Sequence, residues 1–298
     1  MFRRACAIAQ QYTMPVVLSR RTVDGVCSSV INSFVVINQQ GWAVTAAHIV
    51  RQLEQLIVEG KASQGAQKRR AVIEGDASLS RKQRQSALKA IPIPRPDATD
   101  RWSAWWGRDG IGVAECHILD AADLAIVRFE RFPPDWIPRY PVFKNPQREF
   151  EPGTSLCKLG FPFHSIVPEY DATRARFELP PGSLPMPMFP LDGILTRIIS
   201  LGYPDRDDAT GTIPVKFVET SSPGLRGQSG GPTFDVEGTV WAIQVQTANM
   251  PLGFDPPVAG ANNRQREHQF LNVGWGVHSQ TVLTFLNQFG IQYETSDY

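Results

Sequence analysis

Residues 224–232 read GLRGQSGGP. The stretch places Ser229 among four glycines and ends on a proline, a composition that is unfavourable inside a helix or a strand. Glycine lets a turn adopt positive φ and lets the backbone approach a ligand closely. The stretch therefore predicts either a plain surface turn or a backbone cradle whose amide groups face a ligand.

The rest of the chain has the composition of an ordinary globular protein. It has 298 residues, 30 of them basic and 29 acidic, for a net charge of +1, so overall charge gives no argument for binding nucleic acid or an anionic membrane. No stretch approaches the roughly 20 apolar residues that span a bilayer. The apolar run after Arg3 and Arg4 is too short for a signal peptide.

Four widely spaced cysteines, without a CxxC pattern, indicate reduced thiols and a cytoplasmic protein: Cys6, Cys27, Cys116 and Cys157. Their spacing alone leaves two disulfides open.

Short apolar or alternating runs separated by turns predict a mainly antiparallel β fold, either a sandwich or barrels. A helix is expected from Phe2 to about Gln11, leading into a strand, and another from Ser279 to Phe289. The strand runs are Val30–Ile37, Trp42–Thr45, Gly112–Ile118, Leu124–Phe129, Ser155–Leu159, Ile194–Leu201, Val215–Thr220, Thr239–Thr247 and Asn272–His278.

Three stretches interrupt this pattern. Residues 51–91 look helical and polar, and residues 61–90 carry eight Lys or Arg against two acids. A solvated face is the favoured interpretation, with a surface for a protein or nucleic-acid partner as the alternative. Residues 179–192 are rich in proline and predict a loop, as do residues 249–268.

The sequence also contains the groups that acyl transfer by serine requires. These are a hydroxyl, a neutral imidazole, a carboxylate to hold the imidazole, and amides for the oxyanion. His48 stands in GWAVTAAH, Asp123 in DAADLAIVRF and Ser229 in the glycine-rich turn, while Asp120 is a rival for the carboxylate. We expect the remaining histidines of interest to be structural: His117, His164 and His268.

These strings, in the order His, Asp, Ser, resemble the trypsin-like (chymotrypsin-fold) serine proteases, especially bacterial members. SSVINSFVVINQQGWAVTAAHIV is similar to the first-barrel strands and histidine turn of that family, and PGTSLCKLGFP to the strand that opens the second barrel. VGWGVHSQTV resembles the specificity-pocket strand that runs into the last helix, so that the similar segments extend from about residue 28 to 287.

The resemblance implies two six-stranded antiparallel β-barrels, a C-terminal helix and a helical insertion in the first barrel. The first lobe would span residues 1–135, with the basic insertion at 51–91, and the second lobe residues 136–298.

By the same resemblance, Ser229 is the nucleophile, His48 the general base and then acid, and Asp123 the residue that orients His48. Asp123 is preferred to Asp120 because the family carboxylate directly precedes the leucine of the DLA string. The amides of Gly227 and Ser229 form the oxyanion hole, the substrate is a protein or peptide, and no metal or organic cofactor is needed.

Three positions depart from the secreted animal members of the family. Ile49 and Leu225 stand where those members have cysteines, which agrees with a reducing compartment. Gln228 replaces the aspartate that captures a newly released N-terminus, so activity should not depend on trimming the N-terminus. The loop at 179–192 could cover the cleft as a lid, although an inert surface loop is the favoured alternative.

Specificity is harder to derive from the sequence. Pro223 replaces the aspartate of Arg/Lys-cutting members, so a basic P1 residue is not expected. By resemblance, Gln244, Val245 and Gln246 would pair with the substrate backbone as an added strand. Gly276 and His278 fall at the rear wall of the pocket, where His278 would either bond a polar or acidic P1 group or be a satisfied structural histidine.

The sequence therefore predicts a regulated intracellular endopeptidase without a membrane partner. Residues 51–91 are the candidate docking surface if a regulatory protein binds, and nucleic acid is not the expected partner. The alternative is a catalytically silent module that keeps the fold and binds a protein or nucleic acid.

Overall fold

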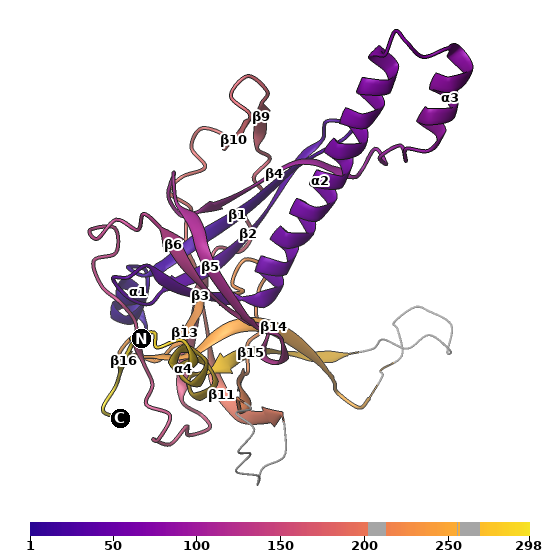
Figure 1. Cartoon of the computed structure of the whole chain (residues 1–298). Helices are drawn as coiled ribbons and strands as arrows, with labels where there is room; N and C mark the ends of the chain where they lie inside the picture. The colour runs from indigo at the N-terminus through magenta and orange to yellow at the C-terminus, as the bar shows by residue number, and fades with distance from the viewer. Residues whose placement is uncertain (202–212, 255, 257–268) are drawn as a thin grey trace.

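The computed structural model describes residues 1–201, 213–254, 256 and 269–298. The chain forms two antiparallel β lobes with helices outside them (Figure 1), which confirms the predicted mainly β, chymotrypsin-like class. Successive side chains of a strand point to opposite faces, so apolar residues that alternate with polar ones gather on one face. In each lobe the apolar faces of the strands, rich in β-branched and aromatic residues, point inward and form the core.

The first lobe is a six-stranded sheet with strand order β4-β1-β2-β3-β6-β5. Phe34, Trp106 and Phe129 pack against one another inside it, with ring centroids 5.3 to 5.6 Å apart. Its strands are β1 (Thr13–Thr22), β2 (Cys27–Val36), β3 (Trp42–Ala46), β4 (Thr99–Trp106), β5 (Gly112–Leu119) and β6 (Leu124–Glu130).

The second lobe is a closed barrel, because the order β13-β8-β11-β12-β15-β14 is completed by pairing of β13 with β14. Two short strands, β7 (Val142–Phe143) and β16 (Glu294–Thr295), extend this sheet in parallel register. The barrel strands are β8 (Ser155–Gly160), β11 (Phe189–Leu201), β12 (Val215–Thr220), β13 (Pro232–Phe234), β14 (Val240–Pro251) and β15 (Phe270–His278).

The predicted insertion is helical; it runs alongside β4 of the first lobe, and its far end extends beyond the lobes (Figure 1). It consists of α2 (Ala47–Gly75), which begins four residues earlier than predicted, and α3 (Arg81–Lys89), which begins at a capping box between Ser80 and Gln83. We call α2 and α3 the arm. The N-terminal helix α1 (Arg3–Ala9) and the C-terminal helix α4 (Ser279–Gln288) are also present. None of the helices in the described residues is long and apolar enough to cross a membrane.

Two predicted loops are partly wrong. Within 179–192, β11 already begins at Phe189 and includes Pro190. Pro190 is tolerated because it pairs with Leu159 of β8 on one side only, whereas pairing with β12 starts at Leu195. Within 249–268, β14 continues to Pro251, which lies opposite Phe270. Most of the remainder, residues 255 and 257–268, lies outside the described residues.

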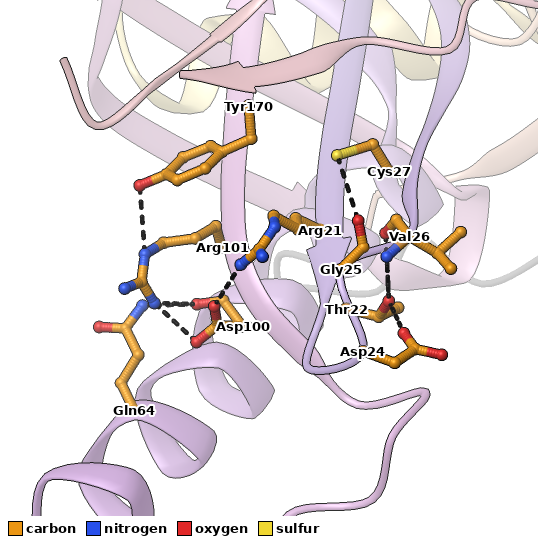
Figure 2. Close-up of polar contacts among 10 residues, drawn as sticks. All are labelled: Arg21, Thr22, Asp24, Gly25, Val26, Cys27, Gln64, Asp100, Arg101 and Tyr170. Carbon is orange, nitrogen blue, oxygen red and sulfur yellow. Dashed lines mark hydrogen bonds and ion pairs between the residues drawn. The ribbon is translucent and has the colours of Figure 1, made fainter. Parts of the chain in front are cut away.

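A hairpin from the second half of the chain, β9 (Glu169–Asp171) and β10 (Arg176–Glu178), reaches the first lobe. Figure 2 shows Arg101 Nε donating to the Tyr170 hydroxyl at 3.2 Å, while Asp100 binds Arg21 at 3.1 Å and Arg101 at 2.6 Å. Gln64 of α2 donates to the Asp100 carbonyl. The hairpin, the first-lobe sheet and the arm are thus joined at one point.

Candidate active site

His48 and Asp123 are brought together by two adjacent strands. In the antiparallel pair β3–β6, Ala46 lies opposite Leu124, so the residues after β3 meet the residue before β6. Asp123 has φ of 50°, a left-handed conformation that aspartate tolerates better than most residues.

The Asp123 carboxylate holds His48 in two ways. Its Oδ2 lies 2.7 Å from His48 Nδ1, and its Oδ1 accepts the His48 backbone N–H at 2.8 Å. The ring is therefore fixed with Nε2 available for a second partner. Asp120, the alternative carboxylate, instead forms a bidentate pair with Arg51 at 2.7 Å.

The turn around Ser229 is one that only glycine permits. Gly227 has φ of 98° and Gly230 has φ of 83°. A Cβ atom would lie 2.3 Å from the Phe161 carbonyl oxygen at Gly227, and 2.0 Å from the Ser33 carbonyl oxygen at Gly230. These distances are far below van der Waals contact, so the glycines are required by close backbone approach, and the turn is more than a plain surface loop.

The amides of this turn divide into two groups. Gly230 N donates to Gln244 O and Gly231 N donates to Gln228 O. Within the described residues, the N–H groups of Gly227 and Ser229 have no protein acceptor. Both amides are thus available to a ligand, as an oxyanion hole requires.

The Ser229 hydroxyl lies at the same cavity as His48. In the described part of the chain its hydrogen bond goes to the Val245 carbonyl, at 3.4 Å, rather than to His48. The cavity has a volume of about 620 Å³. Its lining residues are His48, Pro223, Gly224, Leu225, Arg226, Ser229, Gln244, Val245, Gln246, Thr247, Asn249 and Asn272.

Four of the six residues predicted for substrate binding line this cavity: Pro223, Gln244, Val245 and Gln246. Val245 is bulged out of the β14–β15 register, between Gln244 and Gln246, which turns its carbonyl toward Ser229. On the edge of β14 that faces away from β15, backbone hydrogen bonds continue as far as Gln244, which bonds to Gly230 and Gly231. Gln246 and Thr247 beyond it are exposed.

Gly276 and His278 lie elsewhere. Gly276 sits between β12 and β14, and a Cβ there would lie 2.8 Å from Ala242 Cβ. The His278 side chain is buried, and its Nδ1 accepts the Gln280 N–H at the start of α4. Burial, followed by the nearby Lys216 charge, lowers the pKa of His278 to about 3. This placement favours the structural interpretation of His278 that the sequence left open.

The other histidines are also engaged away from the cavity. His117 binds Glu115 at 2.8 Å and stacks on Phe289, and His164 contacts the Pro187 carbonyl. His268 lies outside the described residues. Among the residues that the structure describes, no group of His, Cys, Asp or Glu is arranged to hold a metal ion.

Sequence reasoning missed one group next to the cavity, the Lys158 ammonium. Lys158 lies on β8, is 1% exposed and reaches the carbonyl oxygen of Pro223. The available signal was a lysine inside the apolar run Ser155–Leu159, where a charged residue needs a specific partner.

A family model described as the trypsin-like peptidase domain matches residues 32–243. No curated protein matches the chain.

Among solved structures, the active form of the Rv3671c protease from M. tuberculosis is similar over 98% of this chain and 86% of its own, with 12% identity and a TM-score of 0.47. A variant of the HtrA-type protease AlgW, solved with a tripeptide, is similar over 97% of this chain and 63% of its own, with 11% identity and a TM-score of 0.46.

Proposed function

Because the chain belongs to the trypsin-like peptidase family, we propose that it is a serine endopeptidase that cleaves peptide bonds through an acyl-enzyme on Ser229. His48, Asp123 and Ser229 form the catalytic triad, and the amides of Gly227 and Ser229 form the oxyanion hole. The substrate is a protein or peptide that lies in the cavity shared by His48 and Ser229.

The reaction begins when the Ser229 hydroxyl turns from the Val245 carbonyl toward His48 Nε2. Ser229 Oγ attacks the scissile carbonyl carbon, and His48 accepts the hydroxyl proton. Asp123 stabilises the resulting imidazolium through the 2.7 Å contact at Nδ1. The Gly227 and Ser229 amides receive the developing oxyanion.

His48 then donates its proton to the leaving amine, which breaks the peptide bond and leaves the acyl group on Ser229. A water molecule, deprotonated by His48, attacks this ester, and proton return to Ser229 restores the enzyme.

One observation carries the proposal: the Asp123 carboxylate holds both the ring and the backbone of His48 at the mouth of the cavity that contains Ser229. A surface histidine without a catalytic task needs no such double contact. The arrangement supports the role of His48 as a general base for a serine nucleophile.

A fluorophosphonate probe tests the proposal, because it reacts only with an activated serine. We expect labelling of the wild type, complete loss of labelling in Ser229→Ala, and unchanged labelling in Ser78→Ala, an exposed serine in the turn between α2 and α3. A folded wild type that stays unlabelled would favour the alternative, a binding module that has lost turnover.

We also propose that the enzyme is a regulated effector of a reducing compartment such as the cytoplasm. All four cysteines carry free thiols, which supports that compartment. The arm supports docking of a regulatory protein, because it projects from the lobes with eight basic and two acidic residues between 61 and 90. Binding of a candidate partner to the wild type, but not to a chain lacking residues 76–90, would test it.

A further inference from the structure

The ammonium of Lys158, a residue within β8, is buried in a cluster of neutral acceptors. Four acceptors surround its three N–H groups: Thr220 Oγ1 at 2.8 Å, the Ser222 carbonyl at 2.5 Å, Ser222 Oγ at 2.8 Å and the Pro223 carbonyl at 3.1 Å. These acceptors belong to the end of β12 and to the segment that leads to Ser229.

This cluster lies directly behind the wall of the catalytic cavity. Pro223 and Gly224 line the cavity, and Lys158 bonds the carbonyl of Pro223. From the β15 side, a Cβ atom at Gly274 would lie 2.8 Å from Lys158 Nζ, and Asn272, two residues before Gly274, lines the cavity. The absence of a side chain at Gly274 therefore lets the ammonium and the Ser222 carbonyl lie close against β15.

The ammonium has no anionic partner inside the protein. In the described chain no carboxylate lies within 4.0 Å of Lys158, and all four acceptors are neutral. Burial accordingly lowers the pKa of Lys158 to about 7. A buried cation without a carboxylate is costly to the folded protein, and an incoming anion would relieve that cost.

The cavity itself offers a consistent electrostatic environment. Arg226 contributes a positive charge to its lining, and none of the described lining residues carries a carboxylate. Side-chain donors face the same space from β14. Thr247 Oγ1 donates to the Gly224 carbonyl at 2.6 Å, and Gln244 Nε2 donates to the Gln246 carbonyl at 2.8 Å. Both donors can turn toward a substrate anion that enters between Gly224 and Thr247.

We propose that the cavity selects substrates with an acidic side chain, Asp or Glu, at P1, and that Lys158 is the residue that determines this specificity. The inference rests on the proposed endopeptidase function and names its substrate class. The P1 carboxylate occupies the space beside Pro223 and Gly224, accepts hydrogen bonds from Gln244 and Thr247, and is stabilised by the Lys158 charge that lies behind this wall.

A purely structural role for Lys158 makes a different prediction. A lysine that only fastens the segment at 222–223 would affect all substrates equally, whereas a specificity residue affects acidic substrates alone. The comparison between P1 Glu and P1 Gln isolates the charge, because the two side chains have nearly the same shape.

The test uses three peptides that are identical except for Glu, Gln or Lys at P1, and measures kcat/KM with the full chain. We expect the wild type to cleave the Glu peptide about tenfold to a hundredfold faster than the Gln peptide, the range for a hydrogen bond to a charged group. The Lys peptide should be the poorest of the three. In Lys158→Met the ratio of Glu to Gln should fall to about one.

Lys144→Met is the matched control, because Lys144 is also a buried lysine but contacts Phe150, Trp241 and Tyr298 away from the cavity. It should leave the ratio of Glu to Gln unchanged. If Lys158→Met does not fold, Arg226→Gln, at an exposed position of the lining, should still reduce the ratio relative to the wild type.

Two results would overturn the inference: a labelled wild type that cleaves the Gln peptide as fast as the Glu peptide, or a Lys158→Met variant that keeps the wild-type ratio. An inactive wild-type protein is a separate result. A folded wild type that neither reacts with fluorophosphonate nor cleaves any peptide would contradict the proposed function itself, and the inference with it.

Discussion

At the scale of single residues, the protonation of Lys158 makes substrate preference depend on pH. Its pKa of about 7 lies inside the working range of a protease, and lies there because burial disfavours the ammonium. Lys158 is therefore charged below about pH 7 and neutral above it. Acidic substrates need the charged form, whereas a P1 Gln substrate does not.

We expect the ratio of kcat/KM for P1 Glu over P1 Gln to be highest near pH 6 and to fall as pH rises past about 7. Ionisations that affect both substrates equally cancel in the ratio. A pH profile from 6 to 9 measures this ratio without any variant. A ratio that is constant across this range, or that rises with pH, would contradict the role of Lys158.

Other groups around the Lys158 cluster do not account for such a change. Burial raises the pKa of the Cys157 thiol to about 12, and the pKa of His278 is lowered to about 3, so neither changes charge between pH 6 and 9. Glu219 on β12 is held by Arg197 and Trp275, and its pKa is lowered. Asp192 lies opposite Cys157 on β11.

Prediction at the level of residues relies on local strings that the chemistry requires. GQSGGP and TAAH are recognisable because the close backbone approach at Gly227 and Gly230, and the turn after β3, restrict the residues near the reacting groups. Lys158 could not be found in this way. Its proposed role depends on β8, β12 and β15 lying together behind the cavity, and no local sequence pattern indicates that arrangement.

At the scale of elements, α2 packs on the first lobe through a glycine. A Cβ atom at Gly60 would lie 2.2 Å from the ring of Trp102 on β4, whereas one at Gly65 would meet only the Arg69 guanidinium, at 3.6 Å. The absence of a side chain at Gly60 is what allows the tryptophan to lie against the helix.

The two glycines should therefore respond in opposite directions to alanine. Gly65→Ala should raise the free energy of unfolding by about 0.5 to 1 kcal/mol, the usual gain for this change inside a helix. Gly60→Ala should lower it despite the same gain, because the methyl group displaces Trp102. Urea denaturation followed by circular dichroism measures both, and equal stabilisation of the two variants would disprove the packing argument.

Strand prediction succeeded where apolar and polar residues clearly alternate, and it failed where pairing with other strands determines that a segment is a strand. β12 was predicted at its observed bounds, Val215–Thr220. β4 was missed because TDRWSAWW mixes polar and aromatic residues and most of its side chains are only half-buried. β13 has three residues and exists because it pairs with both β8 and β14, which no local window can reveal.

At the scale of the whole molecule, the geometry of the cavity depends on contacts between the two lobes. Ser33 N on β2 donates to the Ser229 carbonyl at 2.9 Å, which ties the nucleophile turn to the first lobe. The hairpin of β9 and β10 contacts the same sheet at its far end, where Tyr170 lies against Arg21 and Arg101 (Figure 2). The resemblance predicted the two barrels, but these ties were not predictable because they join residues from distant parts of the chain. The division at residues 1–135 and 136–298 stays a prediction.

The proline-rich loop before β11 provides a further tie. Met186 is 6% exposed and packs in a cluster with Val17 and Ile31 of the first lobe and with Phe161 and Ile166 of the second half. A segment fixed in this way covers apolar surface between the lobes. The sequence left two alternatives for this loop, a moving lid and an inert surface loop. The packing instead favours a loop that covers apolar surface and stabilises the fold.

Met186→Ala should therefore lower the free energy of unfolding by about 2 kcal/mol, the lower end for a buried methionine truncated to alanine, because the loop can partly collapse into the cavity. Leu184→Ala is the matched control in the same loop, since Leu184 is 44% exposed and should change stability by less than about 0.5 kcal/mol. Chemical denaturation of both variants measures the difference. Equal stability of Met186→Ala and the wild type would mean that the loop does not join the lobes. If Met186→Ala destabilises the fold yet leaves the P1 Glu to Gln ratio unchanged, the loop holds the lobes together while selectivity resides in the wall in front of Lys158.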